Sequence, residues 1–497
     1  MSVVKARKDS PPAVDLLAPD AQHVAWVTPA RVMWAAFMCF CVALGLSHMW
    51  LDPLWIVAAL VGLMGLYLVI SYPIMGVLAY IGFEYTRLAL LLPALQKLQP
   101  GKVIVVITFV SFVLQSLRSR SFTMIWDRVG LVWLLWLALA LCSIPGSIST
   151  KLAWNGVLDL ARFVAVYLLL VNVIDSWPKW SAVVWLLLLL NFKLSQFQIR
   201  SYQHGVGFTD DRESFINQGV GVGVHGFFSN SNDFGVAMCV IVPLAVYMVM
   251  ASKSKLLRAA ALVMSGAFMA SILYTSSRGA ALGLAVMGLA YWLKSRRKLF
   301  MGIAVAVLLA GYWIVAPPEL ESRFHSGVDY EQDRSATQRL EAWKGGLRMM
   351  VEHPLAGVGM SNFRPNIEAD PKAVGAARYS HSNWIQAGSE LGVFAILLFL
   401  WVLYIAFERN RETRQILAGR GGRAKQMTAF THALDISMVG FIVTGTFTAM
   451  LYYPFMYVNL ALIVSLHAIA LKETAAQSQA AVPIPKLESP REAALVT

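Results

Sequence analysis

The sequence predicts an all-α protein that crosses a membrane many times, and three observations lead to this class. Of the 497 residues, 58% are hydrophobic and only 14% are charged, whereas an ordinary soluble domain carries about 25% charged residues. Apolar runs of about 20 residues recur along the whole chain, each long enough to cross a hydrocarbon core about 30 Å thick. Basic clusters separate these runs. Because backbone polar groups find no water inside a bilayer, such spans must be helical.

The apolar runs, taken in chain order, predict about 12–14 transmembrane helices. The weakest run is 74–95, because Glu84 and Arg87 interrupt it. The runs 257–275 and 279–293 are separated only by TSSRG and form either a hairpin or one broken helix. The expected spans are 31–48, 51–71, 74–95, 102–117, 127–145, 156–174, 180–197, 231–250, 257–275, 279–293, 299–316, 385–406, 433–452 and 454–471.

The basic clusters indicate how the chain is oriented in the membrane. If the basic N-terminus is inside and successive spans alternate, every cluster falls on the cytoplasmic side, as the positive-inside rule requires. The clusters occupy residues 5–8, 118–120, 252–258, 294–298 and 408–425. The net charge of +13 is therefore interpreted as a topology signal, and no nucleic-acid partner is expected.

This orientation divides the chain into five expected parts. Loops longer than about 15 residues are usually functional or disordered, and the largest loop contains a pattern typical of an amphipathic helix at 335–354. Its apolar face is expected to carry Leu340, Trp343, Leu347 and Val351, and the helix is expected to stop before Pro354. The five parts are a cytoplasmic tail at 1–30, transmembrane helices at 31–316 with an outer loop at 198–230, a large periplasmic loop at 317–384, C-terminal transmembrane helices at 385–471 and a disordered cytoplasmic tail at 472–497.

Three cationic or titratable side chains share the outer face in this arrangement. Arg278, in the turn SSRGA, is either an arginine that snorkels to the interface or a phosphate ligand, because a guanidinium presents a fork of donors. Arg339 is a weaker candidate on the amphipathic helix, where Lys344 and Arg348 compete with it. His381 is either a structural or capping residue or a base, since histidine is well suited to accept a hydroxyl proton near neutral pH.

No metal or cofactor is expected. The sequence has no HExxH and no DxD pattern, and the adjacent Asp210 and Asp211 are a weak metal signal. The four cysteines all lie inside apolar runs and are interpreted as small buried hydrophobic residues: Cys39, Cys41, Cys142 and Cys239.

Three segments follow one another in a fixed order: SSRGA, then RLEAWKGGLRMMVEHPLAGVGMSNF at 339–363, then SHSNWIQAGSELGVFAILLF at 380–399. Together they resemble the C-terminal signature of the O-antigen ligase and polymerase superfamily. The resemblance covers about 275–400. Residues 226–238, GFFSNSNDFGVAM, are similar to a weaker G-x-F segment, and the first two hundred residues match only in hydropathy.

The chain departs from the family pattern at two places. Many members have His-Asn where this chain has His381 and Ser382, although members of the exosortase-associated branch have His-Ser. The family also often places an arginine just before the G-x-F segment, where this chain has His225. Arg212 and Arg200 are the nearest upstream substitutes.

The resemblance implies a metal-independent, inverting glycosyltransferase with a GT-C-like fold in the bacterial inner membrane. Its donor would be a glycan on undecaprenyl pyrophosphate at the periplasmic face, with membrane lipids around the lipid tail. It further implies that His381 is the catalytic base and that Arg278, Arg339 and Arg212 bind the donor pyrophosphate. The acceptor would be a glycan, a lipid A-core sugar or a protein.

Other functions stay open. Within the enzyme class, the chain is a ligase, a repeat-unit polymerase or a protein O-oligosaccharyltransferase, because all three break the same bond between sugar and phosphate. A transporter of polysaccharide is the alternative class, and it would favour internal repeats and ionisable residues near the bilayer midplane. The conspicuous charges inside the predicted spans are Glu84, Arg87, Asp159 and Arg162, of which the last two are spaced to pair with each other.

Overall fold

The computed structural model describes residues 53–86, 100–118, 124–204, 231–275, 277–295 and 334–481, with a few isolated residues between them. These residues form fifteen helices and no strand, which confirms the all-α class. The helices are α2 (Pro53–Ser71), α3 (Pro73–Thr86), α6 (Pro100–Arg118), α7 (Arg128–Cys142), α8 (Thr150–Val173), α9 (Trp177–His204), α11 (Ser231–Ala251), α12 (Lys255–Tyr274), α13 (Arg278–Lys294), α16 (Arg334–Glu352), α17 (Phe363–Ala369), α18 (Asn383–Leu391), α19 (Val393–Ile416), α20 (Arg423–Gly445) and α21 (Pro454–Ala481).

Eight of the described helices are long and apolar enough to cross a membrane, namely α6, α8, α9, α11, α12, α19, α20 and α21. Two shorter apolar helices, Ala59–Ser71 and Arg128–Cys142, accompany them. Exposed apolar side chains such as Val61 and Leu63 on α2 are what a bilayer would cover. The chain is therefore a multi-pass membrane protein. The predicted spans 31–48 and 299–316 lie outside the residues that the structure describes, apart from isolated positions.

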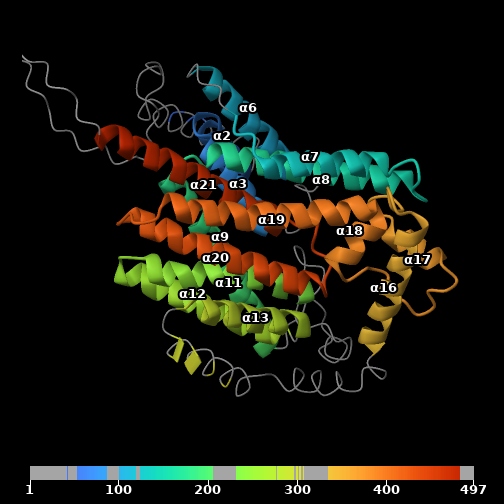
Figure 1. Ribbon diagram of the computed structural model, residues 1–497. Coiled ribbons are helices and arrows are strands. Elements are labelled where there is room, and N and C mark those ends of the chain that lie inside the picture. Colours follow the sequence, from blue (N-terminus) through green and yellow to red (C-terminus); the bar gives the residue numbers. More distant parts are fainter. Residues whose placement is uncertain are drawn as a thin grey trace, which may run out of the picture.

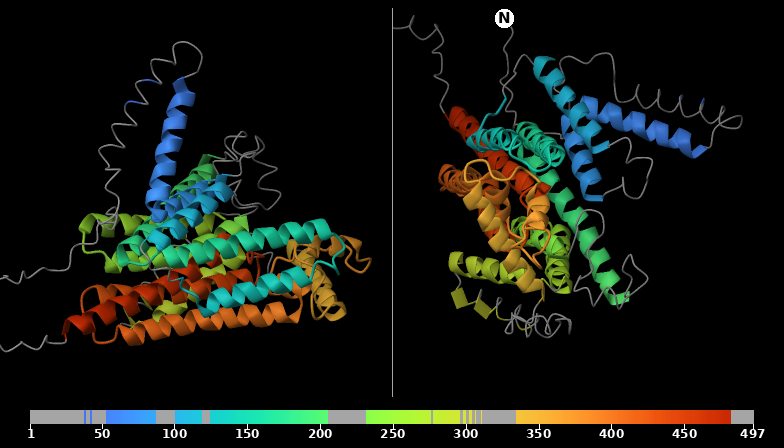
Figure 2. Two further views of the ribbon diagram at one scale, coloured as in Figure 1. Left: turned by 90° about the horizontal axis from the view of Figure 1, so that it is seen from above. Right: turned by 90° about the vertical axis from the view of Figure 1, so that its right-hand side faces the viewer.

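The long helices run side by side, and α16, α17 and α18 gather at one end of the bundle (Figure 1). Two further views show α2 projecting away from this bundle, with α3 at its base (Figure 2). We call the end that holds 143–149, 277–279, 343–392 and 445–454 the site end. Contacts between distant segments define it, because the Ser149 N–H donates to Asn362 Oδ1 at 2.9 Å and the Met450 N–H donates to Asn383 Oδ1 at 2.6 Å.

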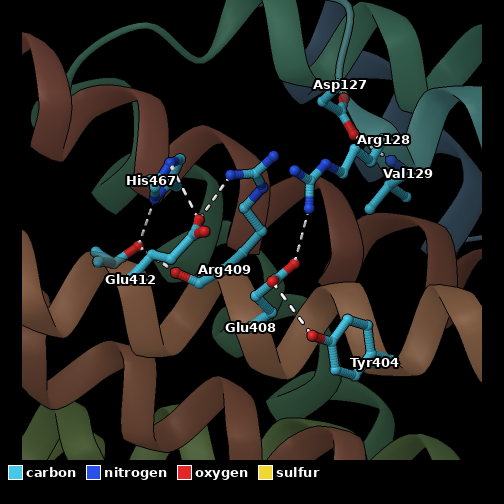
Figure 3. A network of polar contacts seen from close by, with 9 residues as sticks. Asp127, Arg128, Val129, Tyr404, Glu408, Arg409, Glu412 and His467 are labelled. Atoms are coloured by element: carbon cyan, nitrogen blue, oxygen red, sulfur yellow. Dashed lines mark hydrogen bonds and ion pairs between the residues drawn. The ribbon is translucent and has the colours of Figure 1, made fainter.

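The opposite end of the bundle, which we call the basic end, holds residues 251–258, 294–295, 404–426 and 472–477. Arg128 pairs there with Glu408 at 3.1 Å, and Arg409 pairs with Glu412 at 2.6 Å (Figure 3). His467 lies 3.8 Å from the same Glu412 carboxylate. The basic clusters 252–258, 294–298 and 408–425, so far as they are described, thus share the end opposite to the candidate site residues, which is the separation that the sequence predicts.

The span predicted at 385–406 is wrong in its bounds, because two helices divide this segment. Gly392 has φ 80° and ψ −173°, a conformation that ends α18 and starts α19 at a new angle. The Val393 N–H donates to the Pro354 carbonyl at 2.8 Å, so the break is also the place where the long loop is anchored. The membrane helix consequently continues to Ile416, and 408–425 is mostly helix rather than loop.

Three other helices also differ from their expected boundaries. Helix α9 continues to His204, into the segment expected as an outer loop, and α21 continues to Ala481, ten residues beyond the expected end of the last span. Helix α20 begins at Arg423 and ends at Gly445, earlier than the predicted span 433–452. Polar residues prolong these helices because neighbouring helices satisfy them, as in the Arg423–Glu473 pair at 3.0 Å.

Gly357 allows the loop after α16 to lie directly against the backbone of α18, and its replacement has a predictable effect. Its φ is 63°, and an added Cβ would lie 2.3 Å from the Glu390 carbonyl carbon. Gly375 has a similar φ of 75°, but nothing lies within 4 Å of an added Cβ. We expect Gly375→Ala to cost about 1 kcal/mol for the left-handed backbone alone, and Gly357→Ala to cost several times more. Thermal unfolding of both variants in detergent checks this, and equal losses would contradict it.

Candidate active site

Helix α16 forms where the sequence predicts it, but it presents a different face to the protein. Leu340, Leu347 and Val351 of the predicted apolar stripe are 45%, 53% and 80% exposed. The packed face instead carries small residues, since an added Cβ at Gly345 would meet Ile367 and one at Gly346 would meet Ile385. The predicted stripe is therefore wrong as a packing surface. The two glycines let α17 and α18 approach α16 closely. A search for hydrophobic periodicity does not detect such a face, because glycine is not counted as a hydrophobic residue.

The two cations that compete with Arg339 on α16 are occupied by carboxylates. Arg348 makes a two-point contact with Asp370 Oδ2, at 3.0 Å from Nε and 2.5 Å from Nη2, which lowers the pKa of Asp370. Lys344 pairs with Glu341 at 2.7 Å. Arg339 lies elsewhere on the helix, four residues before Trp343 and so on the same side of the helix as that ring. The structure thus places the candidate arginine on the side of α16 that carries Trp343.

Trp343 connects α16 to the segment that carries His381. Its indole Nε1 donates to the Ser380 carbonyl at 2.9 Å, and the Ala377 N–H donates to the Gln338 carbonyl at 2.9 Å. His381 itself has φ 46°, a left-handed conformation that is uncommon for a residue with a side chain. Such backbone positions persist only where the surroundings hold them, and they concentrate at functional sites.

The residues after His381 fix the start of α18. Ser382 is the N-cap, and its hydroxyl accepts from the Ile385 N–H at 3.5 Å. Asn and Ser are both favoured N-caps, so Ser382 in place of the usual Asn keeps this local structure. Trp384 Nε1 donates to Thr446 Oγ1 at 3.2 Å, and Asn383 packs against Gly445. His381 is therefore held between α16 and the turn that follows α20.

The surroundings of His381 keep its imidazole neutral. Burial is the larger cause and the positive charge of Arg339 the smaller one, and together they lower the pKa of His381 to about 4. A neutral imidazole can accept a proton, whereas an imidazolium cannot. The Tyr379 ring lies edge-on to the imidazole, with 6.4 Å between ring centroids. The site therefore presents a neutral imidazole within the electrostatic influence of the Arg339 cation.

Arg278 reaches the same end of the bundle as the first residue of α13. Ser277 caps this helix by accepting from the Ala280 N–H at 3.3 Å. The next residue, Gly279, packs against Phe447, and the Phe447 ring lies 6.3 Å from that of Trp343. A continuous set of contacts thus leads from the start of α13 through Phe447 and Trp343 to the His381 segment.

Four residues that the sequence singles out lie outside the described residues: Arg212, Asp210, Asp211 and His225. Among described residues no group of three or more His, Cys, Asp or Glu side chains could hold a metal ion.

Buried carboxylates were missed by sequence reasoning. Burial raises the pKa of Glu390 to about 7, although backbone N–H groups of Ser361 and Phe363 stabilise its charged form. Its place in the segment 380–399, which resembles the family signature, was the available signal. Asp233, in the segment that resembles the weaker family motif, is buried and accepts from the Tyr453 hydroxyl at 3.3 Å. These carboxylates tie the loop at 357–363 and the start of α11 to the site end.

Two carboxylates inside the membrane helices are paired with cations. Asp159 and Arg162 pair at 3.4 Å, as their spacing predicts. Asp435 was overlooked as an intramembrane charge and is buried on α20, where Lys294 at 3.1 Å and Arg414 at 2.8 Å contact it. Asn410 adds a hydrogen bond of 2.9 Å. Two cations around one carboxylate tie α13, α19 and α20 together.

The fold and the site define an all-helical, multi-pass membrane protein with a histidine, arginines and tryptophans gathered at one end. Residues 259–400 match the family model described as O-antigen ligase. The match contains Arg278, Arg339 and His381, and it confirms the resemblance of this part of the chain to the O-antigen ligase and polymerase superfamily. No curated protein matches the chain. The match supports a glycosyltransferase-like enzyme of surface polysaccharide assembly that acts on a lipid-linked glycan and an acceptor.

Proposed function

We propose that this chain is a membrane glycosyltransferase of the O-antigen ligase type, transferring a glycan from undecaprenyl pyrophosphate to an acceptor hydroxyl at the periplasmic face of the inner membrane. The observation that carries the proposal is the placing of His381, which is held in a left-handed conformation between α16 and the turn after α20, with its imidazole kept neutral by burial and by the charge of Arg339. A general base and an anion-binding cation are the two groups that this reaction needs.

The proposed step needs no metal or cofactor. Neutral His381 takes the proton of the acceptor hydroxyl, and the hydroxyl oxygen attacks the anomeric carbon of the donor sugar. The bond between that carbon and the pyrophosphate oxygen breaks, and its electron pair leaves with undecaprenyl pyrophosphate. Attack from the side opposite the leaving group inverts the anomeric carbon. Arg278 and Arg339 stabilise the developing negative charge, with Arg212 proposed as a third ligand.

The charge arrangement fits this order of events. Without donor, the charge of Arg339 disfavours protonation of His381. A bound pyrophosphate places negative charge between them, which offsets that repulsion and lets the imidazole accept a proton. Donor binding would thus prepare the base, so that transfer follows binding.

The ligase reaction, polymerisation and protein glycosylation differ only in the acceptor. Purified protein should therefore be incubated with a glycan on undecaprenyl pyrophosphate and, separately, with a lipid A-core, a second lipid-linked repeat unit and a protein acceptor. Transfer to one acceptor with release of undecaprenyl pyrophosphate supports the proposal and identifies the branch. Movement of the intact lipid-linked glycan across a vesicle membrane, without transfer, would instead favour a transporter.

The proposed orientation predicts the labelling of two introduced cysteines. Val374, at the site end, is 84% exposed, and Gly421, at the basic end, has nothing within 4 Å of an added Cβ. In a background without the four native cysteines, an impermeant thiol reagent applied to cells with a permeabilised outer membrane should label Val374→Cys and spare Gly421→Cys. We expect this pattern because the positive charges of the basic end favour the cytoplasmic side of the membrane. The reverse pattern would place His381 on the wrong side for a periplasmic donor.

A further inference from the structure

The basic end contains a hollow of about 670 Å³ that the proposed reaction does not use. Its lining comes from α9, α20, α21, the end of α11, the start of α12 and the turn between these two helices. These are the ends of helices that are long and apolar enough to cross a membrane. The hollow therefore lies where such helices emerge from the bilayer, at the end opposite to His381.

The polar side of the hollow is positively charged. Lys253 is exposed and makes no ion pair with any residue that the structure describes, and Arg423 is more than half exposed beside Glu473. Two cations therefore line the hollow against one carboxylate. Around it the sequence adds further cations on the same segments, namely Lys255, Arg258, Arg420, Lys425 and Lys472.

The other side of the hollow is aromatic and apolar. The Trp177 ring lies 5.8 Å from that of Phe430 and stacks on Trp180 at 5.3 Å, which holds it in place. Trp185 and Met248 continue this wall, and Leu257 remains partly exposed at its edge. Tryptophan concentrates at the level of lipid headgroups, where its ring has both an apolar and a polar side.

From this division we propose that the hollow binds one anionic glycerophospholipid. Its phosphate would lie between Lys253 and Arg423, and the start of its acyl chains would lie on Trp177, Trp185 and Phe430. A soluble phosphate compound would satisfy the cations but leave the aromatic wall exposed to water. A zwitterionic lipid would satisfy the wall but bring a cation toward Lys253 and Arg423. The anionic lipid satisfies both sides.

The test measures binding of phosphatidylglycerol and phosphatidylcholine to the full-length protein in detergent, by native mass spectrometry. We expect retention of phosphatidylglycerol in preference to phosphatidylcholine. Lys253→Gln should weaken phosphatidylglycerol binding about five-fold, since one basic residue near an anionic surface contributes about 1 kcal/mol. Because Lys253 is exposed and forms no ion pair among the described residues, this variant should unfold at the wild-type temperature without lipid.

Lys472→Gln is the matched control, because it removes the same charge at the same end but outside the lining. It should bind phosphatidylglycerol as the wild type does. Equal loss in both variants would show diffuse attraction to the basic end and overturn the proposal. Equal retention of the two lipids, or wild-type binding by Lys253→Gln, would also overturn it. Displacement of the lipid by millimolar inorganic phosphate would show a site for free phosphate instead.

Discussion

His381→Ala should lower glycan transfer by about 10²–10⁴-fold, the usual contribution of a general base. Expression, membrane insertion and thermal unfolding should stay near those of the wild type, because the imidazole is half-buried and Ser380 and Ser382 make the local backbone contacts. Transfer is measured as release of undecaprenyl pyrophosphate. His353→Ala is the matched control, since this histidine is exposed at the same end of the bundle.

The pH dependence separates a base from a merely structural histidine. The pKa of His381 is lowered to about 4, so its neutral form persists at pH values well below its usual pKa of 6.5. The acid limb of kcat/KM, which reports the free enzyme, should therefore fall as the pH drops through about 4. If a folded His381→Ala protein transfers glycan at nearly the wild-type rate, His381 is not the base. If the acid limb of the wild type instead falls near pH 6.5, the lowered pKa assigned to His381 is wrong.

Arg339→Lys and Arg278→Lys should each weaken donor binding by about ten-fold or more, although charge is kept. Lysine lacks the planar fork of donors that matches two phosphate oxygens, and a hydrogen bond to a charged group contributes about 1.5–3 kcal/mol. Binding is measured with a radiolabelled lipid-pyrophosphate glycan. Arg364→Lys is the control, because Arg364 is exposed and already paired with Glu368 at 3.0 Å. Wild-type donor affinity in both test variants would contradict the assignment.

Arg339 also allows a test that involves His381. Arg339→Gln removes the smaller of the two causes that lower the pKa of His381, so the acid limb should move upward from about 4. The acid limb should stop short of pH 6.5, because the burial of His381 remains.

Wild-type activity should survive EDTA, and strict dependence on a divalent ion would contradict the metal-free step.

The sequence by itself determined the class of this protein and indicated the candidate residues of its site. Apolar runs must be helical in a bilayer, because the bilayer interior has no water to form hydrogen bonds with the backbone. The described spans are helical, as this argument predicts. The position of α16 and the pairing of Asp159 with Arg162 also follow from local spacing. The motifs around Arg278, Arg339 and His381 fall within the family match.

Only the tertiary structure decided how those residues are used. Leu340 and Leu347 had the correct period for a buried face, yet Gly345 and Gly346 provide the packing surface, because close approach depends on the partner helix. Gly392 breaks a run that hydropathy reads as one span, since a left-handed φ costs glycine nothing and leaves mean hydropathy unchanged. Arg348 contacts Asp370, a partner 22 residues away that no local spacing predicts. Local pattern determines which helices form, whereas long-range contacts determine which faces pack and which side chains meet.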